Sequence, residues 1–138
     1  MKMLTNGCFD LLNIGHVESL NYIKRTYPGE LIVLLNSDSS IARLKGSHRP
    51  IINQDDRKYL LESLEAVDKV IIFDSLDVSK LIDEIEPDIY VKSQDYTFDT
   101  INTRERDALI RNNVLIRFIP LVESHSTSNI IKKIKELQ

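Results

Sequence analysis

Residues 5–16 decide how this chain folds and what it can bind; they read Thr5-Asn6-Gly7-Cys8-Phe9-Asp10-Leu11-Leu12-Asn13-Ile14-Gly15-His16. A β-type opening runs into a turn at Gly7, and after His16 apolar residues recur every third position from Val17 to Ile23. This order predicts a strand, a loop and a helix, with Gly15 and His16 at the helix mouth. The N-terminus of a helix has free backbone N–H groups and the positive end of the helix dipole, and both favour the binding of a phosphate. A histidine there adds a hydrogen bond or a proton to a phosphate oxygen.

Two common phosphate loops do not fit this stretch. A Walker A loop would end in Gly-Lys-Ser/Thr, and the dinucleotide fingerprint needs three glycines, whereas residues 5–16 hold only Gly7 and Gly15.

Covalent catalysis by Cys8 is not expected, because a nucleophilic thiol needs a base or strong local positive charge.

Strand-like and helix-like patterns alternate along the whole chain. The expected strands are 2–6, 31–36, 69–73, 89–92 and 114–119, and the expected helices are 16–25, 39–44, 54–64, 78–84, 103–112 and 128–137. Unbroken apolar strands such as 32–35 suit a parallel sheet that is buried on both faces. We therefore predict an α/β fold with a doubly wound, five-stranded parallel sheet in a single domain over 1–138. Ile130, Ile131, Ile134 and Leu137 predict that the last helix packs one face on the core.

Composition excludes several classes of protein. The chain has 18 Lys and Arg against 21 Asp and Glu, a formal net charge of −3, which argues against a nucleic-acid binder. Its longest apolar run, 31–35, is too short to span a membrane. The N-terminus runs straight into an expected strand without a signal-peptide core. The single cysteine fits a reducing compartment, so we expect a cytoplasmic location. No histidine and cysteine cluster has zinc-ligand spacing.

Positive charge gathers beyond the second expected strand. Arg43, Lys45 and Arg49 lie within seven residues of an otherwise acidic chain. A solvated surface loop is the ordinary interpretation of such a cluster. In a doubly wound sheet, however, this position lies beyond the carboxyl ends of the strands, where ligands bind. The cluster is therefore a candidate clamp for a triphosphate.

Further segments then fall in the order of a known family. Besides Gly7 to His16, they are Leu31 to Asp38, Arg43-Leu44-Lys45-Gly46, Arg49-Pro50, Arg57, Leu64 to Asp68, Val91-Lys92, Asp95-Tyr96 and Ser126 to Ile131. The chain resembles the cytidylyltransferase-like nucleotidyltransferases, with their Rossmann-like fold and His-x-Gly-His motif. Within the family it is most similar to heptose 1-phosphate adenylyltransferase domains and more distantly similar to glycerol-3-phosphate cytidylyltransferase.

The resemblance implies a set of site residues. It places His16, Asn13 and Lys45 at the reacting phosphate. It implies nucleotide contacts from Gly7, Cys8, Phe9, Asp10, Gly15, Arg57, Lys92, Asp95, Ser126 and Thr127. Asp10 is favoured as a brace of the phosphate loop. Arg57 has an equally weighted alternative as a helix ion-pair partner, and the Ser126-Thr127 pair also suits a helix N-cap. His125, just before this pair, is expected to be exposed.

Two positions depart from the family pattern. Asn13 replaces the first histidine of the motif, and its amide can donate a hydrogen bond but cannot carry a charge. The alternative is an asparagine favoured by the local turn. Ser93-Gln94 stands where the family has two glycines, so side chains occupy a place where bare backbone would let a ligand approach.

The expected activity is transfer of the nucleoside monophosphate part of an NTP to a phosphate monoester, with release of pyrophosphate. The resemblance favours ATP with a heptose 1-phosphate-like sugar phosphate, and so a role in carbohydrate metabolism. The alternatives are CTP with a polyol phosphate and a degenerate nucleotide-binding module without turnover. Mg²⁺ is expected to arrive with the triphosphate and no other metal is expected. A homodimer is expected by analogy alone.

Overall fold

The computed structural model describes residues 1–120 and 126–138, and within them strands and helices alternate. The strands are β1 (Lys2–Gly7), β2 (Glu30–Asn36), β3 (Lys69–Phe73), β4 (Ile89–Ser93) and β5 (Leu115–Ile119). The helices are α1 (Ile14–Thr26), α2 (Asp38–Lys45), α3 (Gln54–Glu62), α4 (Ser79–Ile85), α5 (Thr103–Arg111) and α6 (Thr127–Glu136). Each predicted strand and helix is present, with bounds that differ from the prediction by no more than about one helical turn.

All five strands run parallel in a single sheet of order β3-β2-β1-β4-β5. The chain builds outward from β1 to β3 on one side and then returns to place β4 and β5 on the other. The strand order therefore reverses between β1 and β4. This is the predicted doubly wound, Rossmann-like arrangement, and it puts the expected ligand site at the carboxyl ends of these two strands.

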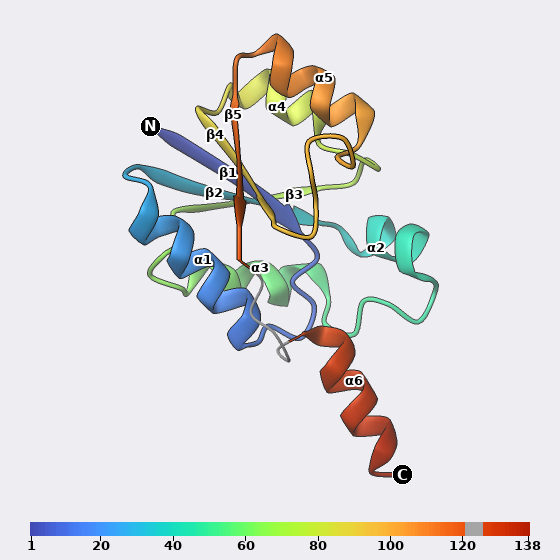
Figure 1. Cartoon of the computed structure of the whole chain (residues 1–138). Coiled ribbons are helices and arrows are strands. Elements are labelled where there is room, and N and C mark those ends of the chain that lie inside the picture. Colours follow the sequence, from blue (N-terminus) through green and yellow to red (C-terminus); the bar gives the residue numbers. More distant parts are fainter. Residues whose placement is uncertain (121–125) are drawn as a thin grey trace.

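Alternate residues of the strands supply two separate cores. Met3 and Val33 face the side covered by α1 and α3, whereas Leu4 and Leu34 face the side covered by α4 and α5. Figure 1 shows the two pairs of helices on opposite faces of the twisted sheet. In β2, residues 31–35 are apolar at consecutive positions because both faces of this inner strand are buried, which is why they read as a continuous apolar run in the sequence.

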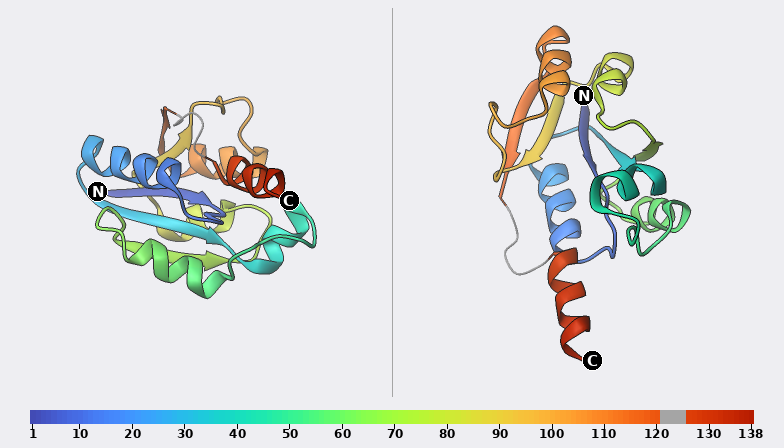
Figure 2. Two further views of the ribbon diagram at one scale, coloured as in Figure 1. Left: turned by 90° about the horizontal axis from the view of Figure 1, so that it is seen from below. Right: turned by 90° about the vertical axis from the view of Figure 1, so that its right-hand side faces the viewer.

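The last helix corrects the sequence-based prediction. No residue of α6 is buried, and the side chains of Ile134 and Leu137 are 49% and 80% exposed. Figure 2 shows α6 projecting away from the body of the molecule, with the C-terminus at its far end. The spacing of the apolar residues predicted the helix correctly. The predicted packing of this helix on the core was wrong, because the other helices already cover both faces of the sheet. In the described ranges no helix is long and apolar enough to cross a membrane.

Candidate active site

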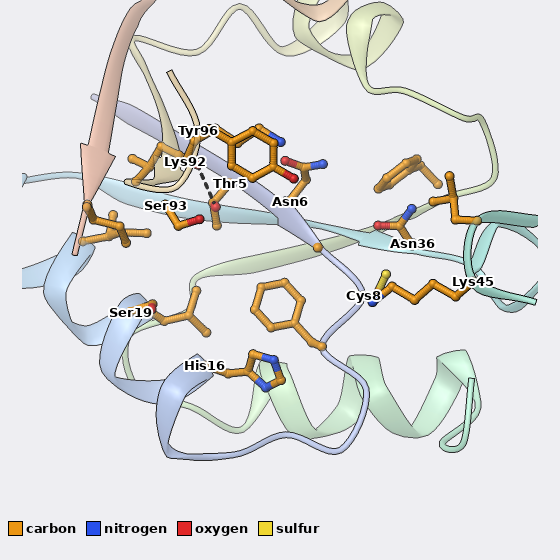
Figure 3. A pocket seen from close by; sticks show the side chains of 18 of the residues that line it. Thr5, Asn6, Cys8, His16, Ser19, Asn36, Lys45, Lys92, Ser93 and Tyr96 are labelled. Carbon is orange, nitrogen blue, oxygen red and sulfur yellow. Dashed lines mark hydrogen bonds between the residues drawn. The ribbon is translucent and has the colours of Figure 1, made fainter. Parts of the chain in front are cut away.

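A pocket of about 430 Å³ lies at the carboxyl ends of the strands, at the point where the strand order reverses. This volume is in the range of small-molecule sites. Its wall comes from the ends of all five strands and from the first two helices; the residues are Thr5–Phe9, His16, Ser19, Leu20, Ile23, Asn36, Leu44, Lys45, Phe73, Leu76, Val91–Ser93, Tyr96 and Ile119. Figure 3 shows His16 and Ser19 on α1, Lys45 reaching from α2, and Lys92 and Tyr96 across the pocket.

The described lining of this pocket is suited to an anion. Lys45 and Lys92 bring two ammonium groups, and His16 brings an imidazole. None of the lining residues is an aspartate or a glutamate. Thr5, Asn6, Ser19 and Asn36 add neutral polar groups. Since the protein as a whole is acidic, this local excess of positive charge favours a phosphorylated ligand.

The loop after β1 places an aromatic ring against the histidine. Phe9 adopts a left-handed backbone conformation with φ of 49°, and its ring lies 5.2 Å from the imidazole of His16, centre to centre, in an edge-on arrangement. A Cβ at Gly7 would lie only 2.9 Å from Phe9 Cε2. Gly7 is therefore required for close approach of the Phe9 ring, which in turn packs on His16.

Asn13 acts at the start of α1 as a helix cap. Its side-chain oxygen accepts the backbone N–H of Gly15 at 3.0 Å, and its amide nitrogen donates to the carbonyl of Leu11 at 3.0 Å. Asn13 and Gly15 do not line the pocket. The Asn13 amide thus makes the local hydrogen bonds of a helix N-cap, which are those that the alternative interpretation of Asn13 expected.

His16 is held in one tautomer by the same turn. The backbone N–H of Asn13 donates to Nδ1 of His16 at 3.3 Å, so Nδ1 is the acceptor and Nε2 carries the hydrogen. Burial lowers the pKa of His16, and the positive charge of Lys45 lowers it further, while Asp10 opposes the shift. His16 therefore offers a neutral Nε2–H donor at physiological pH.

Asp10 braces the loop that carries the positive charge. Its carboxylate is fully buried and accepts from Ile51 N at 2.8 Å, Ile52 N at 2.9 Å and Arg49 Nε at 2.9 Å. Burial alone would raise the pKa of Asp10, but these hydrogen bonds hold it below the ordinary value. Neither Asp10 nor Arg49 lines the pocket, so Asp10 supports the site from behind.

Arg57 corrects a second prediction. Its side chain is fully buried and donates to the carbonyl oxygens of Ile52, Cys8 and Asn36 and to Asp38 Oδ1, each at 2.8 Å. Sequence reasoning placed Arg57 on the nucleotide or in an ion pair within its own helix. Instead it ties α3 to the loops that follow β1 and β2. A buried guanidinium satisfied by the protein has no surface left for a ligand.

The residues after β4 form the opposite wall. Lys92 lines the pocket, with its ammonium 4.8 Å from the ring centre of Tyr96. The hydroxyl of Ser93 donates to Asp95, whose side chain is outside the pocket lining. Ser93 itself lines the pocket. At this position, where the family has a glycine, a side chain therefore takes up space in the pocket wall.

The start of α6 contacts the loop between β1 and α1. Ser126 is the N-cap and its Oγ accepts the backbone N–H of Asn129 at 3.1 Å. The hydroxyl of Thr127 donates to the carbonyl of Asp10, which brings the helix mouth to the loop between β1 and α1. Neither residue lines the pocket. His125 lies outside the described residues.

Sequence reasoning predicted six of the lining residues, namely Gly7, Cys8, Phe9, His16, Lys45 and Lys92. It did not select Asn6 or Thr5 inside β1, Ser19 inside α1, or Asn36 as a pocket residue. Asn6 could have been predicted, since a polar amide in a strand buried on both faces requires a hydrogen-bond partner or a ligand. Ser19 could not, because a serine within an amphipathic helix is common.

No cluster of three or more potential metal-ligating side chains is found in residues 1–120 and 126–138. The pocket lining likewise offers neutral oxygens but no carboxylate. This donor set does not suit a dedicated Mg²⁺ site, which normally includes a carboxylate.

A parallel α/β sheet with a basic pocket at its switch point is the architecture of nucleotide-binding α/β proteins. The family model described as cytidylyltransferase-like matches residues 4–133. The chain therefore belongs to the cytidylyltransferase-like family of nucleotidyltransferases, as the motif around His16 predicted.

Individual relatives agree with this membership. The chain is 46% identical over 134 residues to the bifunctional protein HldE of Wolinella succinogenes and 44% identical over 133 residues to that of Syntrophotalea carbinolica. These matches cover 96% of this chain but only 27% and 26% of the relatives. The chain thus spans about a quarter of their length. A solved structure of a lipopolysaccharide core biosynthesis protein from Thermoplasma volcanium superimposes with a TM-score of 0.69 at 25% identity, covering 88% of this chain and 96% of that one.

Proposed function

We propose that this protein transfers the nucleoside monophosphate part of an NTP, with ATP preferred, to a heptose 1-phosphate-like sugar phosphate. The pocket carries this proposal, because it joins an imidazole donor and two ammonium groups at the switch point of a nucleotidyltransferase fold. The similarity to HldE proteins supports the sugar phosphate, as does the name of the Thermoplasma protein. The reaction would belong to carbohydrate metabolism.

The chemistry is a single in-line displacement. An oxygen of the acceptor phosphate attacks the α-phosphorus of the NTP, and the bond from that phosphorus to the oxygen bridging to the β-phosphate breaks. Pyrophosphate carries away the electron pair. The three described groups suited to this are His16, Lys45 and Lys92, which supply hydrogen bonds and charge and form no covalent bond to the substrate. Positioning and electrostatic stabilisation are the main catalytic terms in such reactions.

Each of these side chains has a distinct part. The Nε2–H of His16 donates to a non-bridging oxygen of the α-phosphate, where negative charge builds up. Lys45 follows the polyphosphate, because it is the exposed last residue of α2 and reaches the pocket from the mouth. Lys92 binds the acceptor phosphate from the opposite wall. Two anions are thereby brought together against their mutual repulsion.

Mg²⁺ enters as part of the substrate in this proposal. Since the pocket lining has no carboxylate, the ion would be held by triphosphate oxygens and water. Ser126 and Thr127 lie at a helix mouth next to the phosphate loop, a position suited to the β- and γ-phosphates. The half-buried free thiol of Cys8 beside the pocket supports a cytoplasmic setting. A homodimer stays a prediction.

The test is a matrix of four NTPs against heptose, hexose and polyol phosphates, with pyrophosphate release as the measured quantity. Pyrophosphate should appear with ATP and a sugar 1-phosphate, and it should depend on Mg²⁺. The His16→Ala protein, purified in the same way, controls for contaminating enzymes. Turnover only with CTP and a polyol phosphate would support the second choice of substrates. Calorimetric binding of an NTP without turnover on any acceptor would show a nucleotide-binding module and overturn the proposed activity.

A further inference from the structure

A buried carboxylate stands directly behind the acceptor wall of the pocket. Glu105, in the first turn of α5, is 5% exposed and does not line the pocket. Its Oε1 lies 3.8 Å from Nζ of Lys92. Lys92 lines the pocket, whereas Glu105 does not. The ammonium group therefore lies between a buried carboxylate and the space for the ligand.

Lys92 is otherwise held by aromatic rings. Its Nζ lies 5.6 Å from the ring centre of Tyr90 and 4.8 Å from that of Tyr96. Within residues 1–120 and 126–138, Nζ donates no hydrogen bond, so none of its donors is committed to these residues. Ring faces attract a cation but do not replace its hydration fully. Among residues 1–120 and 126–138, Glu105 is the carboxylate that pairs with this Nζ, so it can help to keep this poorly solvated group charged.

Tyr90 links the same carboxylate to a second pocket residue. Its fully buried hydroxyl lies 2.9 Å from Glu105 Oε1 and 2.7 Å from the side-chain oxygen of Asn6. A hydroxyl has one hydrogen and so serves one of these acceptors at a time. Tyr90 thereby joins Glu105 to Asn6, which lines the pocket.

We propose that Glu105 is a positioning residue: as a buried anion behind Lys92, it holds the ammonium as a cation that faces the acceptor phosphate. This inference rests on the proposed function for its substrate, but its electrostatic content concerns any phosphate bound at Lys92. Glu105 never touches the ligand. Its effect is that a lysine buried in the pocket wall stays charged to higher pH than it would without the carboxylate.

The charges around Lys92 set the sign of the pH effect. Burial lowers the pKa of Lys92, while Glu105 and Asp95 oppose this shift. In the described part of the chain, the other ionisable groups against it are the phenols of Tyr90 and Tyr96. Burial raises the pKa of Tyr90 well above its ordinary value, and Glu105 adds to the shift. Removing the charge of Glu105 lowers the pKa of Lys92 further, so the ammonium is lost at lower pH.

The experiment compares the pH dependence of kcat/KM for the acceptor in the wild type, Glu105→Gln and Asp107→Asn. Asp107 is exposed on the same helix, so Asp107→Asn removes one carboxylate charge away from the pocket. In Glu105→Gln the alkaline limb should move to lower pH by about 1 unit or more, since an opposite charge at this distance shifts a pKa by that amount. Near the pH optimum the loss should be small. Asp107→Asn should keep the wild-type profile.

Lys92→Met identifies which limb belongs to this lysine. It should lower kcat/KM and remove the alkaline limb, and adding Glu105→Gln to it should then produce no further shift. A uniform decrease of kcat/KM across the pH range in Glu105→Gln would overturn the proposal, because a residue that only supports the fold has that effect. So would a Glu105→Gln shift that persists without Lys92.

A binding experiment separates this inference from the proposed activity. Inorganic phosphate, as a probe of the acceptor phosphate site, is titrated calorimetrically into the same proteins between neutral and alkaline pH. Affinity should fall with rising pH, and in Glu105→Gln the fall should begin at lower pH. If no NTP and acceptor pair turns over, the proposed function fails while this measurement still decides the role of Glu105. Identical pH dependence in wild type and Glu105→Gln would overturn the inference even in an active enzyme.

Discussion

The backbone N–H of Asn13 donates to Nδ1 of His16 at 3.3 Å, while the Asn13 side chain accepts from Gly15. Asn13, which departs from the family motif, therefore fixes the tautomer of His16, which matches the motif. Because Nδ1 is occupied as an acceptor, the neutral imidazole carries its hydrogen on Nε2. A donor with a fixed direction needs no reorganisation when charge develops on a phosphate oxygen.

The first prediction concerns the protonation of His16. Burial and Lys45 lower its pKa, so it should titrate below 6.5, the ordinary value. Above that pH the imidazole is neutral in both the folded and the unfolded chain, and it contributes nothing to the pH dependence of stability. As the pH falls below 6.5 the unfolded chain takes the proton first, so the free energy of unfolding should decrease. Long-range ¹H–¹⁵N spectra should show the Nε2–H tautomer at pH 7. An Nδ1–H tautomer would contradict the assignment.

The second prediction is that His16→Ala lowers kcat by roughly 10²–10³-fold, the effect of removing one preorganised oxyanion donor. The circular dichroism spectrum should stay that of the wild type. His48, exposed in the loop after α2 and outside the pocket lining, provides the matched control. His48→Ala should retain wild-type turnover. Equal kcat for the two variants would remove His16 from the mechanism.

For Lys45 we expect two linked effects. Lys45→Ala should lower kcat/KM for the NTP roughly 10–100-fold, the range of a lost charge-assisted hydrogen bond. It should also raise the pKa of His16, because the positive charge of Lys45 depresses it in the wild type. Kinetics and histidine titration by NMR measure the two effects. Lys80→Ala, which removes an exposed charge from α4, should change neither. An unchanged pKa of His16 in Lys45→Ala would show that the two charges do not interact.

Asn13 can be tested as a helix cap. Asn13→Ala should reduce the free energy of unfolding by about 1 kcal/mol, a typical cost for a lost N-cap. Asn13→Asp keeps an oxygen acceptor for Gly15 and should retain most of that stability. Its negative charge near the phosphate loop should nevertheless weaken NTP binding. Urea unfolding and nucleotide titration measure the two quantities. A stable Asn13→Ala protein with a large loss of kcat would instead assign Asn13 to the ligand.

Arg57 should matter for stability more than for binding. Arg57→Met leaves three backbone carbonyls, of Cys8, Ile52 and Asn36, without their donor. The cost should be at least about 3 kcal/mol, since each buried unsatisfied group is costly. Lys58→Met on the same helix is the control, and urea unfolding is the measurement. A cost below about 1 kcal/mol, the net worth of one ordinary hydrogen bond, with a raised KM for the NTP would return Arg57 to the ligand.

The sequence was sufficient for the elements and for the centre of the site. Strands such as 69–73 and the helix that starts near His16 are specified by residues a few positions apart, through apolar periodicity and capping. The alternation of these elements leaves few topologies open, because parallel strands need right-handed crossovers. Gly7 is the last residue of β1, His16 lies in the first turn of α1, and Lys45 is the last residue of α2, the helix that follows β2. Their meeting at one end of the sheet was thus predictable from the order of the elements along the chain.

What the sequence did not determine depends on neighbours that are distant along the chain. Arg57 and Ser126 match a motif, yet the contacts of Arg57 come from three other segments that only the packed sheet assembles. The apolar face of α6 has the right period, but the layers of the fold left it no core to cover. Glu105 meets Tyr90 and Lys92 only because α5 packs on the sheet beside β4. Periodicity is a property of near neighbours, whereas burial and charge pairing follow from which elements become adjacent, and the tertiary structure alone decides that.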